Sequence, residues 1–177
     1  MIFVSSGRES DCGINIEDSR GMRGLSFRRT KNQLRMTLFS WNENYQMHIK
    51  SIDIQHHRLI EIVNELHDLY LFNPDDSKAF SAILDSLVKY ISTHFQYEET
   101  LLRNYEFPDL EKHIAEHRRL SSDFNNYLEK YRNKDEVDVP SLLNFTREWL
   151  QNHMLGSDME YAQFFARQEK KRKPTDE

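Results

Sequence analysis

The stretch HFQYEETLLRNYEFPDLEKHIAEH, residues 94–117, carries two helical patterns that meet at a single proline, Pro108. Because proline lacks a backbone N–H and its ring clashes with the preceding turn, it is excluded from a helix interior. Pro74 and Pro140 stand in similar settings, in the segments NPDDS and VDVPS. The chain has no glycine between Gly24 and Gly156, which favours helices over hairpins. The three prolines therefore separate four predicted helices, at residues 53–72, 76–106, 109–134 and 141–155.

Apolar residues recur at helical spacing inside these segments. The second predicted helix carries Phe80, Leu84, Leu87, Ile91, Phe95 and Leu102, and the third carries Leu110, Leu120, Phe124, Leu128 and Tyr131. A single apolar stripe of this kind is what a helix buries in a bundle. Since short connections make successive helices antiparallel, we expect an all-α, up-down-up-down four-helix bundle. A shorter C-terminal helix is expected over residues 158–168.

The two ends of the chain differ from this central part. Residues 1–35 contain four of the five glycines, seven basic and four acidic residues, and no sustained apolar period. They are expected to form a flexible extension. Their arginines are accompanied by no aromatic platform or known nucleic-acid fold, so no nucleic-acid partner is predicted. The bundle is expected to span residues 36–168, and residues 169–177 are expected to form a charged tail.

Composition limits the class of protein further. The chain has 177 residues, a formal charge of −5 and 38% apolar residues, which fits one main domain. No stretch free of Asp, Glu, Lys and Arg exceeds nine residues, so a transmembrane helix is excluded and no membrane partner is expected. The opening residues lack a secretory signal, and the single cysteine, Cys12, indicates a reducing compartment. We expect a soluble, cytoplasmic protein; the sequence indicates no oligomeric state.

Five of the eight histidines lie on the apolar stripes of the predicted helices, together with one glutamate. Buried polar groups without partners cost about 1–3 kcal/mol each, so a plain core would not hold so many of them. Residues four apart on a helix are separated by about 6 Å along its axis and can reach the same ion. Two such pairs occur on neighbouring helices. The candidate ligands are His56, His94, Glu98, His113, His117 and His153.

The topology brings these six residues together. In an up-down bundle, the start of the first helix lies beside the end of the second, the start of the third and the end of the fourth. Asp158 follows His153 by five residues, beyond Gly156, and is added as a seventh ligand, although it could instead cap the last helix. His67 lies eleven residues beyond His56, about 16 Å along the helix, and is expected to be structural or at the surface.

The seven side chains provide more ligands than one metal ion needs. A single tetrahedral zinc ion is saturated by four ligands. Five imidazoles, two bridging carboxylates and one bridging oxygen from water leave one position open on a pair of six-coordinate ions. Imidazole and carboxylate without thiolate suit iron, with manganese and zinc as alternatives.

The ordered set of motifs resembles the hemerythrins, in particular the single-domain bacterial proteins of that family. The matching segments are SIDIQHHRLIEIVNEL at 51–66, HFQYEE at 94–99, HIAEH at 113–117, HMLGSD at 153–158, and WNENY at 41–45 ahead of the first helix. The resemblance covers about residues 38–168. It implies two non-haem iron ions, Fe²⁺ or Fe³⁺, with a bridging oxo or hydroxo group.

The resemblance also implies a division of roles among the ligands. His113, His117 and His153 would hold one iron. His56 and His94 would hold the other, which keeps the open position, while Glu98 and Asp158 would bridge the two. Dioxygen would bind at the open position and leave unchanged, so the protein would be an oxygen-binding protein and not an enzyme.

The local sequence suits this role. Leu59 is one turn from His56, while Leu150 and Met154 flank His153, so these apolar side chains are expected to line an oxygen pocket. A dry pocket slows autoxidation. Trp149, one turn before His153, is expected to pack beneath the site, although it could equally be a core residue.

Two other functions are weighed against oxygen binding. A di-iron oxidase or other oxidoreductase builds its site from four carboxylates and two Glu-x-x-His pairs, and no Glu-x-x-His occurs in this chain. An iron-binding or iron-buffering bundle is the second alternative. Oxygen storage, delivery to an oxygenase, sensing and detoxification would all use the same site, and the sequence does not distinguish them.

Overall fold

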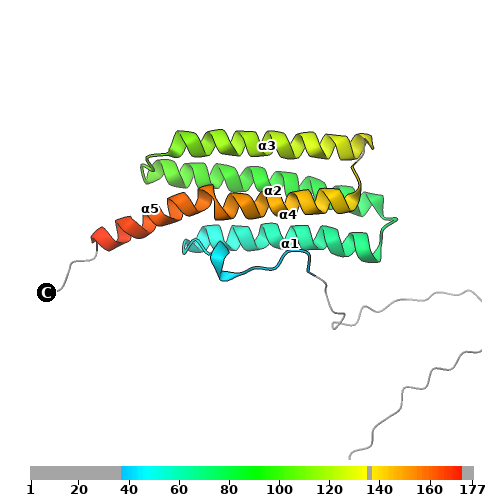
Figure 1. The fold of residues 1–177 in the computed structure, drawn as a ribbon, viewed down its shortest axis with the longest axis horizontal. Helices are drawn as coiled ribbons and strands as arrows, with labels where there is room; N and C mark the ends of the chain where they lie inside the picture. The colour runs from blue at the N-terminus through cyan, green and yellow to red at the C-terminus, as the bar shows by residue number, and fades with distance from the viewer. Residues whose placement is uncertain (1–36, 135–136, 173–177) are drawn as a thin grey trace, which may run out of the picture. The chain divides into compact units, whose positions relative to one another are not determined.

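The structure is a computed structural model that describes residues 37–134 and 137–172. Within these ranges the chain forms five α-helices and one short 3-10 helix, and it forms no strand (Figure 1). None of these helices is both long enough and apolar enough to cross a membrane. The elements are η1 (Glu43–Tyr45), α1 (Lys50–Phe72), α2 (Ser77–Asn104), α3 (Leu110–Asn133), α4 (Val139–Leu155) and α5 (Ser157–Arg172).

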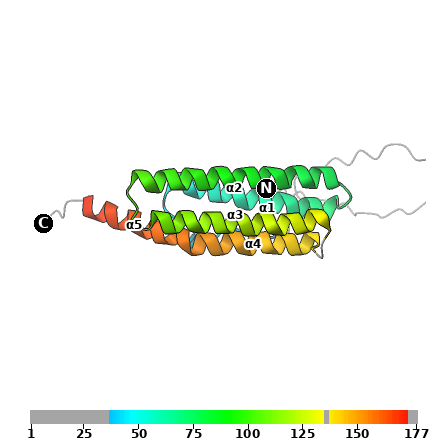
Figure 2. The ribbon, with the colours of Figure 1, turned by 90° about the horizontal axis from the view of Figure 1, so that it is seen from above.

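The first four α-helices form an antiparallel bundle (Figures 1 and 2). α1 packs against α2 and α4, and α3 packs against the same two helices, so the four surround a common core. The predicted all-α, up-down-up-down fold is confirmed. The start of α1, the end of α2, the start of α3 and the end of α4 lie together, at the end from which α5 leaves the bundle.

Some helix ends differ from the prediction for local physical reasons. α1 begins at Lys50, three residues before the predicted start, so that Asp53 lies in its first turn, where the carboxylate accepts a hydrogen bond from the Met47 N–H at 2.7 Å. α4 begins at Val139 and includes Pro140 in its first turn, where no backbone N–H is needed. α5 continues to Arg172, into the predicted tail, since the next helix breaker is Pro174.

Two aspartates cap the N-termini of α2 and α4. The Asp76 side chain accepts a hydrogen bond from the Ala79 N–H at 3.0 Å at the start of α2, and Asp138 does the same for the Ser141 N–H at 2.8 Å at the start of α4. Each cap satisfies a backbone donor that has no partner inside the helix. The turn segments around the prolines therefore end one helix and begin the next, as predicted.

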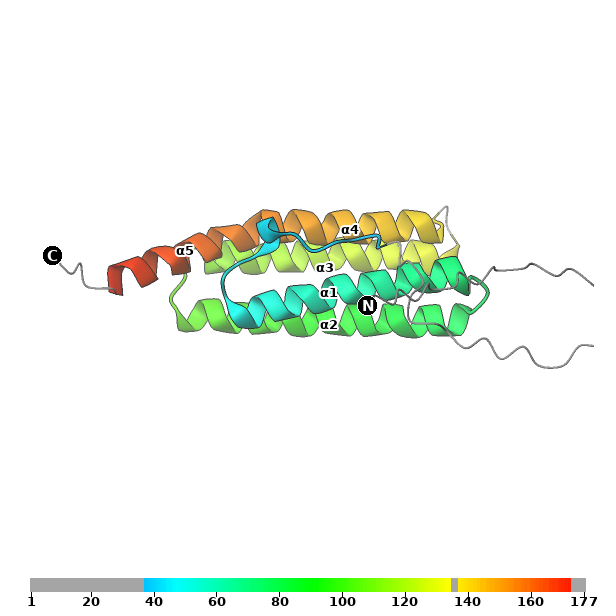
Figure 3. The same cartoon turned by 90° about the horizontal axis from the view of Figure 1, so that it is seen from below.

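The segment before α1 is packed onto the bundle and crosses its α1 and α4 side (Figure 3). The backbone N–H and carbonyl of Phe39 form hydrogen bonds with the Asn64 side chain at 3.0 and 2.8 Å. Phe39, Tyr45 and Met47 are buried. The extension predicted for residues 1–35 and the end of the predicted tail, residues 173–177, lie outside the described residues.

Candidate metal centre

The seven predicted ligands meet inside the bundle at the end next to α5. α1, α2, α3, α4 and the first turn of α5 each contribute, because each helix turns its stripe toward the common core. All seven side chains are buried, with at most 3% of any residue exposed. They are His56, His94, Glu98, His113, His117, His153 and Asp158.

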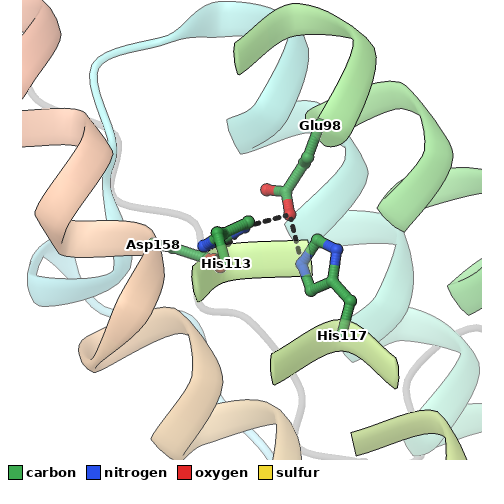
Figure 4. A group of neighbouring side chains, drawn as sticks. All are labelled: Glu98, His113, His117 and Asp158. Carbon is green, nitrogen blue, oxygen red and sulfur yellow. Dashed lines mark ion pairs between the residues drawn. The ribbon is translucent and has the colours of Figure 1, made fainter. Parts of the chain in front are cut away.

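Glu98 lies between two groups of histidines. Its Oε1 is 3.8 Å from the Nε2 atom of His56 and 3.6 Å from that of His94. Its Oε2 faces the other way, at 3.7, 3.3 and 3.9 Å from the Nε2 atoms of His113, His117 and His153. Figure 4 shows the carboxylate reaching from α2 toward the two histidines of α3, with Asp158 on the other side of His113.

Asp158 divides its oxygens in the same way. Its Oδ2 is 3.3 Å from the Nε2 of His56, while its Oδ1 is 3.2 Å from the Nε2 of His153 and 3.9 Å from that of His113. We call His56 and His94 the two-histidine set, and His113, His117 and His153 the three-histidine set. Both carboxylates therefore stand between the sets and offer one oxygen to each.

Most of the polar atoms that face the centre have no hydrogen-bond partners: the Nε2 atoms of the five histidines, the Oε2 of Glu98 and both carboxylate oxygens of Asp158. The Nδ1 of His56, on the outer side of its ring, has none either. Elsewhere in residues 37–134 and 137–172, only the Nδ1 of His67 and the Nε of Arg147 share this condition. A cation between these lone pairs would satisfy them, since neutral imidazoles and carboxylates are ligands for iron, manganese and zinc. The residues fit a metal centre.

Hydrogen bonds on the outer side of the rings point their inner nitrogens at the centre. The Nδ1 of His94 lies 2.9 Å from the Gln55 Oε1, and the Nδ1 of His117 lies 3.0 Å from the Glu99 Oε1. With the proton on Nδ1 donated to these acceptors, each Nε2 keeps its lone pair for a metal ion.

The start of α5 supports the centre from another direction. The Ser157 Oγ lies 3.0 Å from the Nδ1 of His153, and the hydroxyl of Tyr161 donates to the Glu98 Oε1 at 2.5 Å. Gly156 allows this turn, because a Cβ at its position would lie 2.8 Å from the backbone carbonyl oxygen of Asn152. α5 therefore brings three side chains to the centre within little more than one helical turn.

Burial sets the protonation of the side chains. Loss of solvation lowers the pKa of His56, lowers that of His94 to about 4, and lowers that of His153 well below its usual value. These rings are neutral near pH 7 and need not lose a proton to bind a metal ion. Burial also raises the pKa of Tyr161 well above its usual value, with Asp158 and Glu98 adding to the effect, so its hydroxyl keeps the donated proton.

The two carboxyls are shifted in opposite directions. Burial by itself would raise the pKa of Glu98, but the nearby His94, His113 and His117 outweigh it and hold this pKa well below its usual value. Burial and the nearby Glu98 raise the pKa of Asp158 well above its usual value. The two carboxyls therefore differ in how readily each gives up its proton, because two adjacent buried charges repel each other.

The predicted oxygen-pocket residues Leu59, Leu150, Met154 and Trp149 are all buried in the bundle. The Trp149 indole N–H donates to the backbone carbonyl of Leu120 at 3.1 Å, and its ring lies 6.4 Å from the ring of His153. The ring of Phe95 stacks on that of His117, with ring centroids 3.8 Å apart, and its centroid lies 6.0 Å from that of Trp149. Trp149 is thus both a core residue and a neighbour of the three-histidine set.

The remaining histidines stay away from the centre. His57 is exposed and stacks on Trp41, with ring centroids 3.8 Å apart. His48 is also exposed, and the partly buried His67 is not among the side chains that lie close enough together to hold a metal ion.

Four residues around the centre were not predicted: Gln55, Glu99, Ser157 and Tyr161. Three of them directly adjoin a predicted ligand in sequence. That position does not reveal that each of them contacts a different ligand, one that lies on another helix. Tyr161 follows Asp158 by three residues, so helical spacing could have placed it on the same face.

The fold and this cluster define a metal-binding protein of the four-helix-bundle class. The family model described as "Hemerythrin HHE cation binding domain" matches residues 47–165, about two thirds of the chain. The chain belongs to the hemerythrin family, whose members bind non-haem iron.

Individual relatives agree with this assignment. A bacteriohemerythrin of Stenotrophomonas maltophilia (strain R551-3) is 31% identical over 130 residues, which cover 72% of this chain and 81% of that protein. A myohemerythrin of Theromyzon tessulatum is 28% identical over 123 residues, 70% of this chain and 90% of that one. A crystal structure of a hemerythrin point mutant is similar with a TM-score of 0.64 and 28% identity, covering 72% of this chain and 97% of the other.

Proposed function

We propose that this protein binds dioxygen reversibly at a non-haem di-iron centre. The division of the Glu98 and Asp158 oxygens between two histidine sets carries the proposal, because it provides two adjacent metal positions joined by two carboxylates. Bound there with a bridging oxo or hydroxo group, two iron ions would supply the electrons that hold dioxygen and recover them on its release. The family to which the chain belongs supports iron as the metal.

In this proposal each set holds one iron ion. His113, His117 and His153 provide three nitrogens to one position, whereas His56 and His94 provide two to the other. Since both carboxylates contribute one oxygen to each position, the two-histidine position has one ligand fewer. We place the binding of dioxygen at this less occupied position.

The surrounding residues would keep the bound dioxygen dry. Leu59 on α1 and Leu150 and Met154 on α4 have 2% or less of their surface exposed, and we assign them to the wall of the oxygen pocket. By excluding water, these side chains would slow autoxidation of the iron held there. Tyr161 keeps its hydroxyl proton and donates it in a hydrogen bond to the Glu98 Oε1, which holds this carboxylate in place.

This arrangement favours a carrier over an enzyme. Both buried carboxyls stand between the histidine sets as bridges, which leaves neither free to deliver a proton to bound oxygen. We therefore propose oxygen storage, delivery to an oxygenase or oxygen sensing, with the cytoplasmic location that the cysteine content predicts.

The decisive experiment is an oxygen titration of the reduced protein, with its iron content measured. We expect two iron ions per chain, one dioxygen per iron pair, and a visible absorption band that appears in air and disappears under argon. Sustained oxygen consumption with an electron donor, without a stable oxygenated form, would identify an oxidase instead. Iron binding without any oxygen response would identify an iron-buffering bundle.

The pocket wall has its own test. Leu150→Ala should speed the loss of the oxygenated form while both iron ions stay bound, because the vacated volume admits water near the centre. Leu143→Ala on the same helix is the matched control: it also removes a buried leucine but lies about two turns farther from the centre. Equal autoxidation rates in the two variants would remove Leu150 from the wall.

A further inference from the structure

The two histidine sets differ in the groups that hold their outer nitrogens. In the three-histidine set, the Nδ1 of His117 is 3.0 Å from a Glu99 carboxylate oxygen, and that of His153 is 3.0 Å from the Ser157 hydroxyl oxygen. In the two-histidine set, the Nδ1 of His94 is 2.9 Å from the Gln55 amide oxygen, and the buried Nδ1 of His56 has no partner among the described residues. One set has a charged acceptor, and the other has only a neutral one.

This difference affects how strongly each imidazole binds a metal ion. A carboxylate that accepts the Nδ1–H increases the basicity of the ring and makes Nε2 a better ligand, more than a neutral amide does. The Glu99 side chain is only 24% exposed, so solvent screens this interaction incompletely. His117 is therefore a stronger ligand than His94, although both sit in the same buried cluster.

Tyr161 acts in the same direction. Its hydroxyl donates to the Oε1 of Glu98, the oxygen that faces the two-histidine set, at 2.5 Å. The Oε2 that faces the three-histidine set accepts no hydrogen bond from the described residues. A hydrogen bond draws negative charge from the oxygen that accepts it, so Glu98 offers less charge to the two-histidine set.

We propose that Glu99 and Gln55 make the two metal positions unequal. Glu99, acting through His117, makes the three-histidine position the tight one that fills first and favours the more highly charged ion. Gln55, acting through His94, keeps the two-histidine position weaker and its ion easier to reduce. The inference rests on the proposed assignment of one metal ion to each set, but it does not depend on dioxygen binding.

The test changes each hydrogen-bond acceptor separately, by Glu99→Gln or by Gln55→Glu, in the full-length metal-free protein. Fe²⁺ is added under argon and binding is followed by calorimetry with a competing chelator. The unsubstituted protein should bind in two distinguishable steps. Glu99→Gln should weaken the tight step by about 10- to 100-fold and leave the weak step unchanged, because only the His117 acceptor has lost its charge. Gln55→Glu should strengthen the weak step and leave the tight one unchanged.

A second measurement separates this positioning role from a loss of structure. With iron bound, Glu99→Gln should raise the reduction potential of one iron, and Gln55→Glu should lower that of the other. Glu65→Gln is the matched control: Glu65 is an exposed residue of α1 that pairs with Arg58, and its loss should change neither the steps nor the potentials. If the Glu99→Gln protein fails to fold, the binding steps and reduction potentials of Gln55→Glu alone decide whether the proposal holds.

Several outcomes would overturn the proposal: a single binding step in the unsubstituted protein, equal effects of Glu99→Gln on both steps, or no strengthening in Gln55→Glu. Failure of the proposed function gives a different result. In that case, the two unequal steps and their response to the exchanges remain, and the reduced protein takes up no dioxygen reversibly.

Discussion

The two ends of the bundle bury very different side chains with the same four helices. Away from α5 the interior consists of apolar residues such as Phe80, Leu84, Leu128 and Leu142. Next to α5, the interior holds five imidazoles and two carboxyls among apolar residues such as Leu102 and Phe107. Side chains at both ends are shielded from water, since Leu84 is 2% exposed and Glu98 is 0% exposed.

Burial has opposite effects on the free energy of folding at the two ends of the bundle. Burying a leucine or phenylalanine side chain contributes about 1.5–3 kcal/mol to folding, whereas each unsatisfied polar atom costs about 1–3 kcal/mol. The apolar end therefore stabilises the bundle without help, and the polar end is stabilised fully only by a ligand. This contrast separates an apolar end that stabilises the fold from a polar end whose side chains fit a metal ion.

The largest expected effect is loss of metal on replacing one ligand. His113→Ala should remove most of the bound iron, because the remaining ligands cannot complete the coordination of the three-histidine position. His67→Ala, at the other end of α1 from His56, should leave the iron content unchanged. Metal analysis of the two purified variants measures both. Equal loss of iron in the His113→Ala and His67→Ala proteins would mean that the two ends of the bundle do not differ in metal binding as proposed.

A substitution at the apolar end should have the converse effect. Leu84→Ala should lower the free energy of unfolding by about 2–5 kcal/mol, since it leaves a cavity among packed side chains. The iron content per folded chain should stay the same. Chemical denaturation and metal analysis test this prediction, and a Leu84→Ala protein that is folded but free of iron would show that the two ends are coupled.

Removing the metal should destabilise the end of the bundle next to α5 more than the apolar end. A metal ion at a hundred times its Kd stabilises the folded state by about 2.7 kcal/mol, so the metal-free protein should melt at a lower temperature. Amide hydrogen exchange should rise at the end of α2 and the start of α3, and much less around Leu84 and Leu128. A uniform rise along all four helices would contradict the separation of roles.

The smallest expected effect concerns the residues ahead of the bundle. Residues 1–35 show no apolar period, so a chain that starts at Met36 should bind the same amount of iron. Its melting temperature should stay within about 2 °C, because residues without an apolar period are expected to contribute little to stability. A larger fall would mean that the extension stabilises the bundle.

Much of the fold could be predicted because its signals are local. Pro74, Pro108 and Pro140 limit helices wherever they occur, and apolar spacing marks the face that each helix buries. The exact ends were less predictable, since they depend on single contacts such as the one between Asp53 and the Met47 N–H. The gathering of the seven polar residues followed from the same signals, because short connections fix which helix ends meet.

The tertiary structure alone decided how those seven side chains are arranged and supported. Glu98 turns one oxygen toward each histidine set, and its partner Tyr161 lies 63 residues away in the chain. Gln55 and His94 are separated by 39 residues, and Glu99 and His117 by 18. Helical periodicity defines the face on which a side chain lies. Which atom it meets on another helix depends on the rotation and axial shift of both helices, and these are set by the packing of the whole core.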